Sequence, residues 1–184
     1  MPPKTPLPYP YRFINSSPIE QVGENLYCRK HNYCFTSEFI RNGKKQTDRY
    51  ILIIEEYDYK VCAVKFYRQK DKARVGESRY QVLSGNGNAF RVISTALVIV
   101  LDFYNKNPYH SFAFYGVNNC NEGKNLTKRF KVYRKYVIYY IGVTNFDRYE
   151  WADRSYMLLM NKHNQEPYLL RKIESLFREI YNIT

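Results

Sequence analysis

The densest group of side chains that could bind a ligand is a set of positive charges between residues 124 and 135. Lysines recur there at intervals of four, three and four with two arginines among them, and the six residues are Lys124, Lys128, Arg129, Lys131, Arg134 and Lys135. On a helix this spacing places the lysines along one face, from which they can follow a phosphate backbone. The alternative is a basic face that is only solvated. We predict that these residues bind nucleic acid or an acidic protein.

A second basic stretch and the overall charge favour the same kind of partner. The stretch comprises Lys65, Arg68, Lys70, Lys72 and Arg74, and the chain carries a formal net charge of +12. A field of this size attracts polyanions, although it can also serve solubility alone. The chain has 20 tyrosines, whose rings suit half-buried strands and can also stack on unpaired bases.

A glycine loop, "QVLSGNGNAFRV" at residues 81–92, places Gly85, Gly87 and Asn88 directly before an apolar helical pattern. The backbone N–H groups that open such a helix can hold a phosphate. Glycine and asparagine also permit a sharp corner between a strand and a helix, and this is the interpretation that we prefer. We expect Asn88 to cap the helix.

Three possible zinc ligands, Cys28, His31 and Cys34, are spaced at intervals of three. A fourth ligand is missing nearby, and in a strand His31 points away from the face that carries both cysteines. We therefore predict no metal site, and we expect the cysteines to be buried thiols.

Acid–base or nucleophilic catalysis has no evident location in the sequence. His31, His110 and His163 are the histidines, and none has a neighbouring carboxylate or serine in a pattern that indicates a dyad. Glu55 and Glu56 are adjacent within a strand pattern, which sends them to opposite faces.

The elements that must position these side chains form one domain of mixed α and β structure. We expect strands at residues 32–39, 49–57, 60–68, 78–84, 110–117, 148–153 and 156–161. We expect helices at residues 89–105, 125–141 and 166–182, the last with Pro167 in its first turn. The fold class is α+β: an antiparallel meander with an Asn-Gly hairpin, the glycine loop, a central helix, a parallel strand, the basic helix, a closing hairpin and a C-terminal helix.

The proline-rich start predicts an extended arm over residues 1–18, followed by a single domain over residues 19–184. It has no apolar core of the kind that a signal peptide needs. The longest apolar run, residues 96–101, is much shorter than the roughly 18 residues that a membrane span requires. We therefore expect a cytoplasmic protein without a membrane partner, whose oligomeric state the sequence leaves open.

Residues 80–162 resemble an uncharacterised family of small bacterial and phage proteins from mobile genome regions. The likeness rests on "GNGNAFRVISTALVIVLDFYNKNPYHSFAFYGV", "RFKVYRKYV" and "SYMLLMNK". The resemblance implies a setting in conflicts between phages or mobile elements and brings no known activity.

The order of elements resembles that of the GNAT acetyltransferases, in which a meander, a glycine loop, a helix and a parallel strand follow one another. The family's Gln/Arg-x-x-Gly-x-Gly/Ala motif would place Gly85 and Gly87 at the pyrophosphate of acetyl-CoA with Asn88, although Val82 stands at its first position. The resemblance also implies a general acid on the later helix, at Tyr133 or Tyr136.

Three functional hypotheses follow. The first is a non-catalytic or degenerate GNAT-like binding protein that engages a polyanion or a protein and uses no cofactor. The second is an N-acyltransferase that uses acetyl-CoA, with Tyr133 as its acid. The third is an assembly scaffold built from the aromatic strands and the proline-rich arm.

Overall fold

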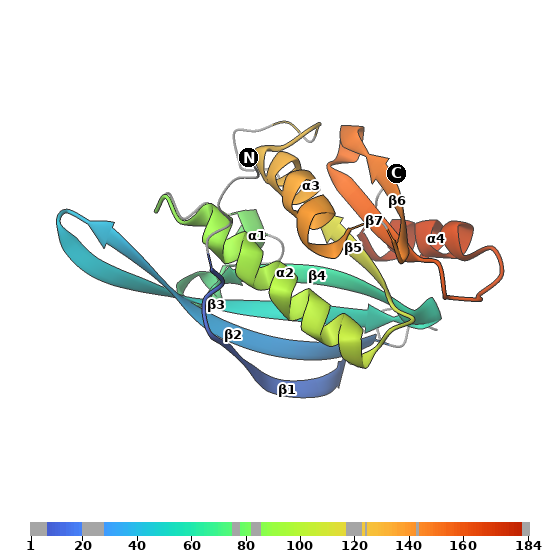
Figure 1. Ribbon diagram of the computed structural model, residues 1–184, viewed down its shortest axis with the longest axis horizontal. Coiled ribbons are helices and arrows are strands. Elements are labelled where there is room, and N and C mark those ends of the chain that lie inside the picture. The colour runs from blue at the N-terminus through green and yellow to red at the C-terminus, as the bar shows by residue number, and fades with distance from the viewer. Residues whose placement is uncertain are drawn as a thin grey trace.

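The computed structural model describes residues 7–19, 28–74, 78–81, 86–116, 123, 125–142 and 144–181. Within these residues it is a mixed α+β fold, with one seven-stranded sheet in the order β1-β2-β3-β4-β5-β7-β6 (Figure 1). The strands are β1 (Tyr11–Ile19), β2 (Cys28–Arg41), β3 (Lys44–Tyr57), β4 (Val61–Arg68), β5 (Ser111–Tyr115), β6 (Phe146–Trp151) and β7 (Tyr156–Asn161). The helices are α1 (Ser78–Gln81), α2 (Ala89–Lys106), α3 (Lys128–Ile141) and α4 (Leu169–Tyr181).

The antiparallel meander is confirmed, and it consists of β1 to β4. The predicted hairpin turn lies between β2 and β3, where Asn42 and Gly43 have φ of 50° and 70°. Both residue types tolerate this left-handed backbone, which a tight hairpin requires. Residues 11–18, assigned above to an extended arm, belong to β1 and pair with β2. The division into an arm and a domain stays a prediction.

The strand predicted over residues 78–84 is wrong in its described part, because Ser78–Gln81 form the short helix α1. Residues 82–84 lie outside the described residues. The ring of Tyr80 is buried edge-on against Tyr67, at 5.7 Å between ring centres, and both pack with Ile53. This tertiary packing outweighs the strand propensity of the segment.

The predicted crossover to a parallel strand is confirmed, but it starts from β4 and not from residues 78–84: the chain passes from β4 through α2 to β5, which pairs parallel to β4. The parallel register runs from Val61↔Ser111 to Val64↔Phe114, so the second half of β4 extends beyond it. In α2 the apolar residues recur at three and four, and Ile93, Leu97 and Val100 are buried. The helix therefore packs its apolar face on the sheet.

Helices cover both faces of the sheet. The core beneath α2 and α3, which lie across one face, includes Leu52, Ile54 and Phe112 (Figure 1). On the opposite face, α4 packs on Ala63 and Leu158. In the described residues, no helix combines the length and the apolar character needed to cross a membrane.

Two helices begin later than predicted for local reasons. Leu126 has a φ of 46° and Thr127 is the N-terminal cap of α3, so that helix starts at Lys128. Tyr168 has a φ of 57°, which ends the preceding turn and places Pro167 before α4 rather than inside it. The closing hairpin is present as β6 and β7.

Candidate functional site

The basic helix α3 is held in place mainly at its N-terminus. The Thr127 hydroxyl accepts a hydrogen bond from the backbone N–H of Phe130 at 3.2 Å and donates one to the carbonyl of Gly116 at 2.7 Å. The backbone N–H of Thr127 donates to the hydroxyl of Ser155 at 2.8 Å. Phe130 and Val137 are fully buried in the core. The helix is thus anchored to the end of β5, and its opposite side faces outward.

Three of the six predicted basic residues lie together on this outward side. Lys128, Lys131 and Lys135 are exposed, and their spacing places them along one face of α3. The first and last of them lie about 10 Å apart along the helix axis. Lys131 and Lys135 form no ion pair with a described residue. Their positive charge is therefore directed at solvent.

The other three predicted residues are not part of this group. The guanidinium of Arg129 is half-buried and donates a hydrogen bond to the carbonyl of Tyr80. The Nε of Arg134 lies 3.0 Å from Oε2 of Glu150 on β6. Lys124 lies outside the described residues. The carboxylate of Glu150 thus offsets the charge of Arg134, whereas Arg129 keeps its charge and is held by a neutral carbonyl.

Aromatic rings continue the lysine row at the C-terminal half of α3. Tyr139 follows Lys135 by one helical turn and is 53% exposed. Phe90 at the start of α2 is 50% exposed, and its ring centre lies 5.5 Å from that of Tyr136. Cations beside accessible rings are the side chains from which single-stranded nucleic-acid sites are built.

The second basic stretch is largely paired with acidic side chains. Lys65 lies 3.0 Å from Glu55, and Arg68 and Arg74 lie 2.7 and 3.1 Å from Asp71. Lys70 contacts Asp48, which also lies 3.7 Å from Arg68. Asp48 and Asp71 are buried. These cations stabilise buried carboxylates and do not extend the surface of α3.

The glycine corner is described in part. Gly85 lies outside the described residues, whereas Gly87 is exposed with a φ of 70°. Asn88 is the N-terminal cap residue of α2, and its carbonyl accepts from the backbone N–H of Val92 at 3.1 Å. The expected side-chain cap is wrong, because Asn88 has a φ of −104° and a ψ of 13°, outside the extended conformation of a capping residue.

The two tyrosines that the acyltransferase resemblance singled out are both packed into the core. Tyr133 is partly buried, and its ring meets Phe66 edge-on with 6.2 Å between the ring centres. Burial raises the pKa of the Tyr133 hydroxyl, and the charge of Arg129 offsets this in part. Burial likewise raises the pKa of Tyr136.

The possible zinc ligands are separated by the sheet. His31 faces α2 and packs edge-on against Phe103, while Cys34 lies on the opposite face beside Arg12. The side chain of Cys28 lies outside the described residues. Within the described part of the chain, no three or more His, Cys, Asp or Glu residues are arranged to hold a metal ion.

A histidine and carboxylate cluster was missed by the sequence reasoning. Glu56 on β3 lies between His31 and His110, with Oε2 2.9 Å from Nε2 of the first and Oε1 2.8 Å from Nε2 of the second. The expectation that no carboxylate neighbours a histidine is therefore wrong. The residues are 25 and 54 positions apart, so only the pairing of β2 with β3 and the turn after α2 bring them together.

Both hydrogen bonds favour the ionised form of Glu56. The bonds from His110 and then from His31 lower the pKa of this carboxyl to about 2, against an opposing contribution from burial. The cluster ties the segment after α2 to the sheet, because the His110 ring also contacts the carbonyl of Asn107 and the ring of Phe103. We interpret it as a structural hydrogen-bond cluster.

Replacement of Glu56 by glutamine is expected to change the acid stability of the protein. A lowered pKa in the folded state stabilises the fold above the ordinary pKa of about 4.5, and this contribution is lost as the pH falls from there towards 2. Because water screens this partly exposed group, we expect about 1 kcal/mol.

Urea unfolding at about pH 6, 5, 4 and 3 measures the difference in the free energy of unfolding between wild type and Glu56→Gln. This is roughly the pH range over which Glu56 gains its proton in the folded or the unfolded state. The wild type should be the more stable protein at pH 6, and the gap should close towards pH 3. Glu179→Gln, an exposed carboxamide substitution on α4, is the matched control. A difference in the free energy of unfolding that stays constant with pH would contradict the lowered pKa of Glu56.

The comparisons with known proteins leave the chain without an assigned family: no protein-family model matches it, and no curated protein and no solved structure is significantly similar to it.

Proposed function

We propose that this protein binds single-stranded nucleic acid through the outward face of α3, without catalysing a reaction on it. The observation that carries the proposal is the row formed by Lys128, Lys131 and Lys135, which continues into the exposed ring of Tyr139. Lysines neutralise consecutive phosphates, and an accessible ring stacks on a base that is not paired.

The anchoring of α3 supports this proposal over a helix that is only solvated. A nucleic acid gains most from charges that are already in position, since ordering flexible side chains and segments costs free energy. The cap at Thr127 and the buried ring of Phe130 hold the lysine row on a rigid element. The second basic stretch is largely matched by carboxylates, so it adds little to the positive surface of α3.

The proposal includes a GNAT-like architecture for the domain. In its favour, the meander leads through α2 to a parallel strand, and the parallel register ends at Val64 while β4 continues to Arg68. An N-acyltransferase remains the alternative for the same architecture. In that case acetyl-CoA would need three parts of the chain: Gly87, the backbone N–H groups that open α2, and Tyr133.

Binding of a labelled single-stranded oligonucleotide, followed by fluorescence anisotropy at increasing salt, tests the proposal. Three phosphate contacts predict a slope of about −2 for log K against log[salt] between about 50 and 200 mM. A duplex of the same sequence should bind more weakly, because its bases cannot stack on Tyr139.

Absence of binding at low salt, or a slope near zero, would contradict the proposal. Acetyl-CoA serves as a separate ligand in a thermal-shift measurement on the same preparation. Stabilisation by acetyl-CoA together with absence of oligonucleotide binding would support the acyltransferase instead.

A further inference from the structure

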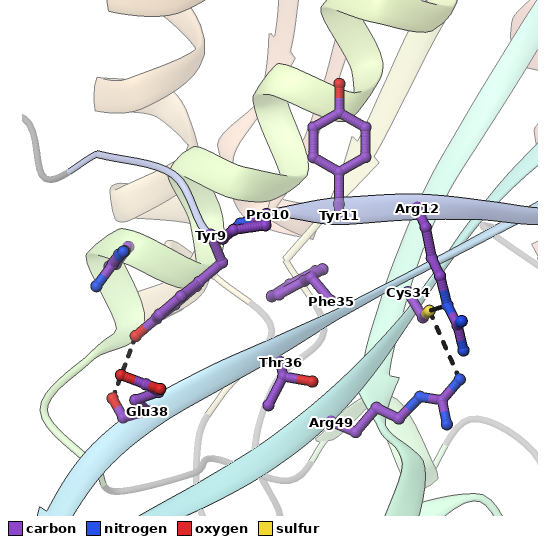
Figure 2. A pocket seen from close by; sticks show the side chains of 10 residues that line it. Tyr9, Pro10, Tyr11, Arg12, Cys34, Phe35, Thr36, Glu38 and Arg49 are labelled. Atoms are coloured by element: carbon purple, nitrogen blue, oxygen red, sulfur yellow. Dashed lines mark hydrogen bonds between the residues drawn. The ribbon is translucent and has the colours of Figure 1, made fainter.

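A cavity of about 610 Å³ opens at the edge of the sheet where β1 begins (Figure 2). Its walls include Tyr9, Arg12, Cys34, Arg49 and Arg91. The volume lies within the range of about 300–1,000 Å³ that is usual for small-molecule sites. Three arginines therefore line one cavity of ligand size.

Two of these arginines converge on one sulfur atom. The Nε of Arg12 lies 3.1 Å from Sγ of Cys34, and Nη2 of Arg49 lies 3.6 Å from the same atom. Figure 2 shows the two guanidinium groups reaching Cys34 from β1 and β3. Strand pairing explains the arrangement, because Arg12 is opposite Cys34, and Arg49 is opposite Thr36, the next residue of β2 on that face.

Within the described residues neither Arg12 nor Arg49 forms an ion pair with a carboxylate. In contrast, other arginines of the described chain do so, namely Arg68, Arg74, Arg134, Arg148 and Arg154. The one acidic residue among those lining the cavity, Glu38, lies 3.0 Å from Lys45 instead. Two like charges thus lie close together on two exposed residues.

The thiol can compensate at most part of this charge. Burial raises the pKa of Cys34, but the hydrogen bonds from Arg12 and Arg49 and their positive charges outweigh it, so that the pKa lies below its ordinary value. A thiolate carries one negative charge against two guanidinium groups. A dianionic group with several oxygens would match the pair better, because a guanidinium presents a planar fork of N–H donors.

We propose that this cavity binds a small organic phosphate, with the phosphate oxygens held between Arg12 and Arg49. The side of the cavity opposite these two arginines suits the organic part of the phosphate ligand. The guanidinium of Arg91 lies 3.9 Å from the ring centre of Tyr9, and its Nε is committed to the carbonyl of Leu7 at 2.7 Å. Tyr9 is buried between Arg91 and Phe35, so the flat surface left for a planar group is the partly exposed guanidinium of Arg91. The site is independent of the lysine row on α3.

Cys34 is only 4% exposed but lines the cavity, so its slow alkylation by iodoacetamide reports on this site. Trypsin releases Cys34 in the peptide from His31 to Arg41, in which it is the sole cysteine, so mass spectrometry can follow its modification. Pyrophosphate and ADP are the probes, against chloride at equal ionic strength. Both should slow the modification at least threefold, and ADP should act at lower concentration because its base packs on the guanidinium of Arg91.

The double variant Arg12→Gln/Arg49→Gln should lose this protection, whereas Arg148→Gln on β6, at the opposite edge of the sheet, should keep it. Isothermal titration with ADP provides a second measurement that does not depend on the thiol, and the double variant should bind at least tenfold more weakly. Equal protection or equal affinity in the double variant would overturn the proposal, as would absence of both effects in the wild type.

The same assay separates this inference from the function proposed for α3. A protein with Lys128, Lys131 and Lys135 replaced by glutamate should still be protected by ADP at Cys34. Loss of protection in that protein would mean that the probe acts through the lysine row, and the cavity would then not be a separate site.

Discussion

Replacement of Lys128, Lys131 and Lys135 by glutamate is expected to weaken oligonucleotide binding about 100-fold at roughly 100 mM salt. The substitutions remove three phosphate contacts and place negative charges where the backbone would lie. The slope of log K against log[salt] should fall from about −2 towards zero. Because all three side chains are exposed, the free energy of unfolding should change by less than about 0.5 kcal/mol.

A matched control tests whether position or total charge matters. Lys44, Lys72 and Lys106 are exposed and lie outside α3, on the β2–β3 hairpin, after β4 and at the end of α2. Their replacement by glutamate changes the net charge by the same amount. The control protein should bind within about threefold of wild type, since exposed charges beyond a Debye length are largely screened. Equal losses in both triple variants would show that binding follows net charge and not the face of α3.

The parts of the fold that the sequence predicted well are those determined by local chemistry. The apolar period of α2 and the Asn-Gly turn between β2 and β3 each depend on neighbouring residues. The segment 78–84 failed because its strand propensity is a local preference, whereas Tyr80 finds its best packing against Tyr67 only in the folded protein.

The candidate site shows the same division between local and long-range information. Helical spacing placed Lys128, Lys131 and Lys135 on one face correctly, because it depends on backbone geometry alone. It could not show that Arg129 would bond to the carbonyl of Tyr80 or that Arg134 would pair with Glu150, since these partners come from other elements. The Arg12 and Arg49 pair escaped notice for the same reason, because strand register brings it together.

Substitution of Gly116 by alanine is expected to destabilise the protein by about 1–3 kcal/mol. Gly116 is buried directly after β5, where α3 begins its first turn against the sheet. A Cβ atom there would lie 2.7 Å from the backbone nitrogen of Phe130 and 2.8 Å from Oγ1 of Thr127. Neither atom is the far end of a flexible side chain, so the start of α3 would have to move.

That movement should also weaken the hydrogen bonds that anchor the helix. The carbonyl of Gly116 accepts from the Thr127 hydroxyl at 2.7 Å, and its N–H donates to the carbonyl of Ser155 at 2.8 Å. A buried carbonyl that loses its donor adds a further penalty. Thermal unfolding should therefore occur about 2–12 °C lower in Gly116→Ala than in wild type, given about 2–4 °C per kcal/mol for a chain of this size.

Gly123→Ala is the matched control, because a Cβ at Gly123 meets no atom of the described residues within 4 Å, and each of the two variants adds one methyl group. Gly123→Ala should unfold within about 1 °C of wild type, which corresponds to less than about 0.5 kcal/mol. If the lysine row binds nucleic acid because α3 is held rigidly, Gly116→Ala should also bind the oligonucleotide more weakly, although no lysine is changed. Equal stability of the two variants would contradict the close approach of β5 and α3. If Gly116→Ala is destabilised but binds the oligonucleotide as tightly as wild type, the position of the start of α3 does not affect binding by the lysine row.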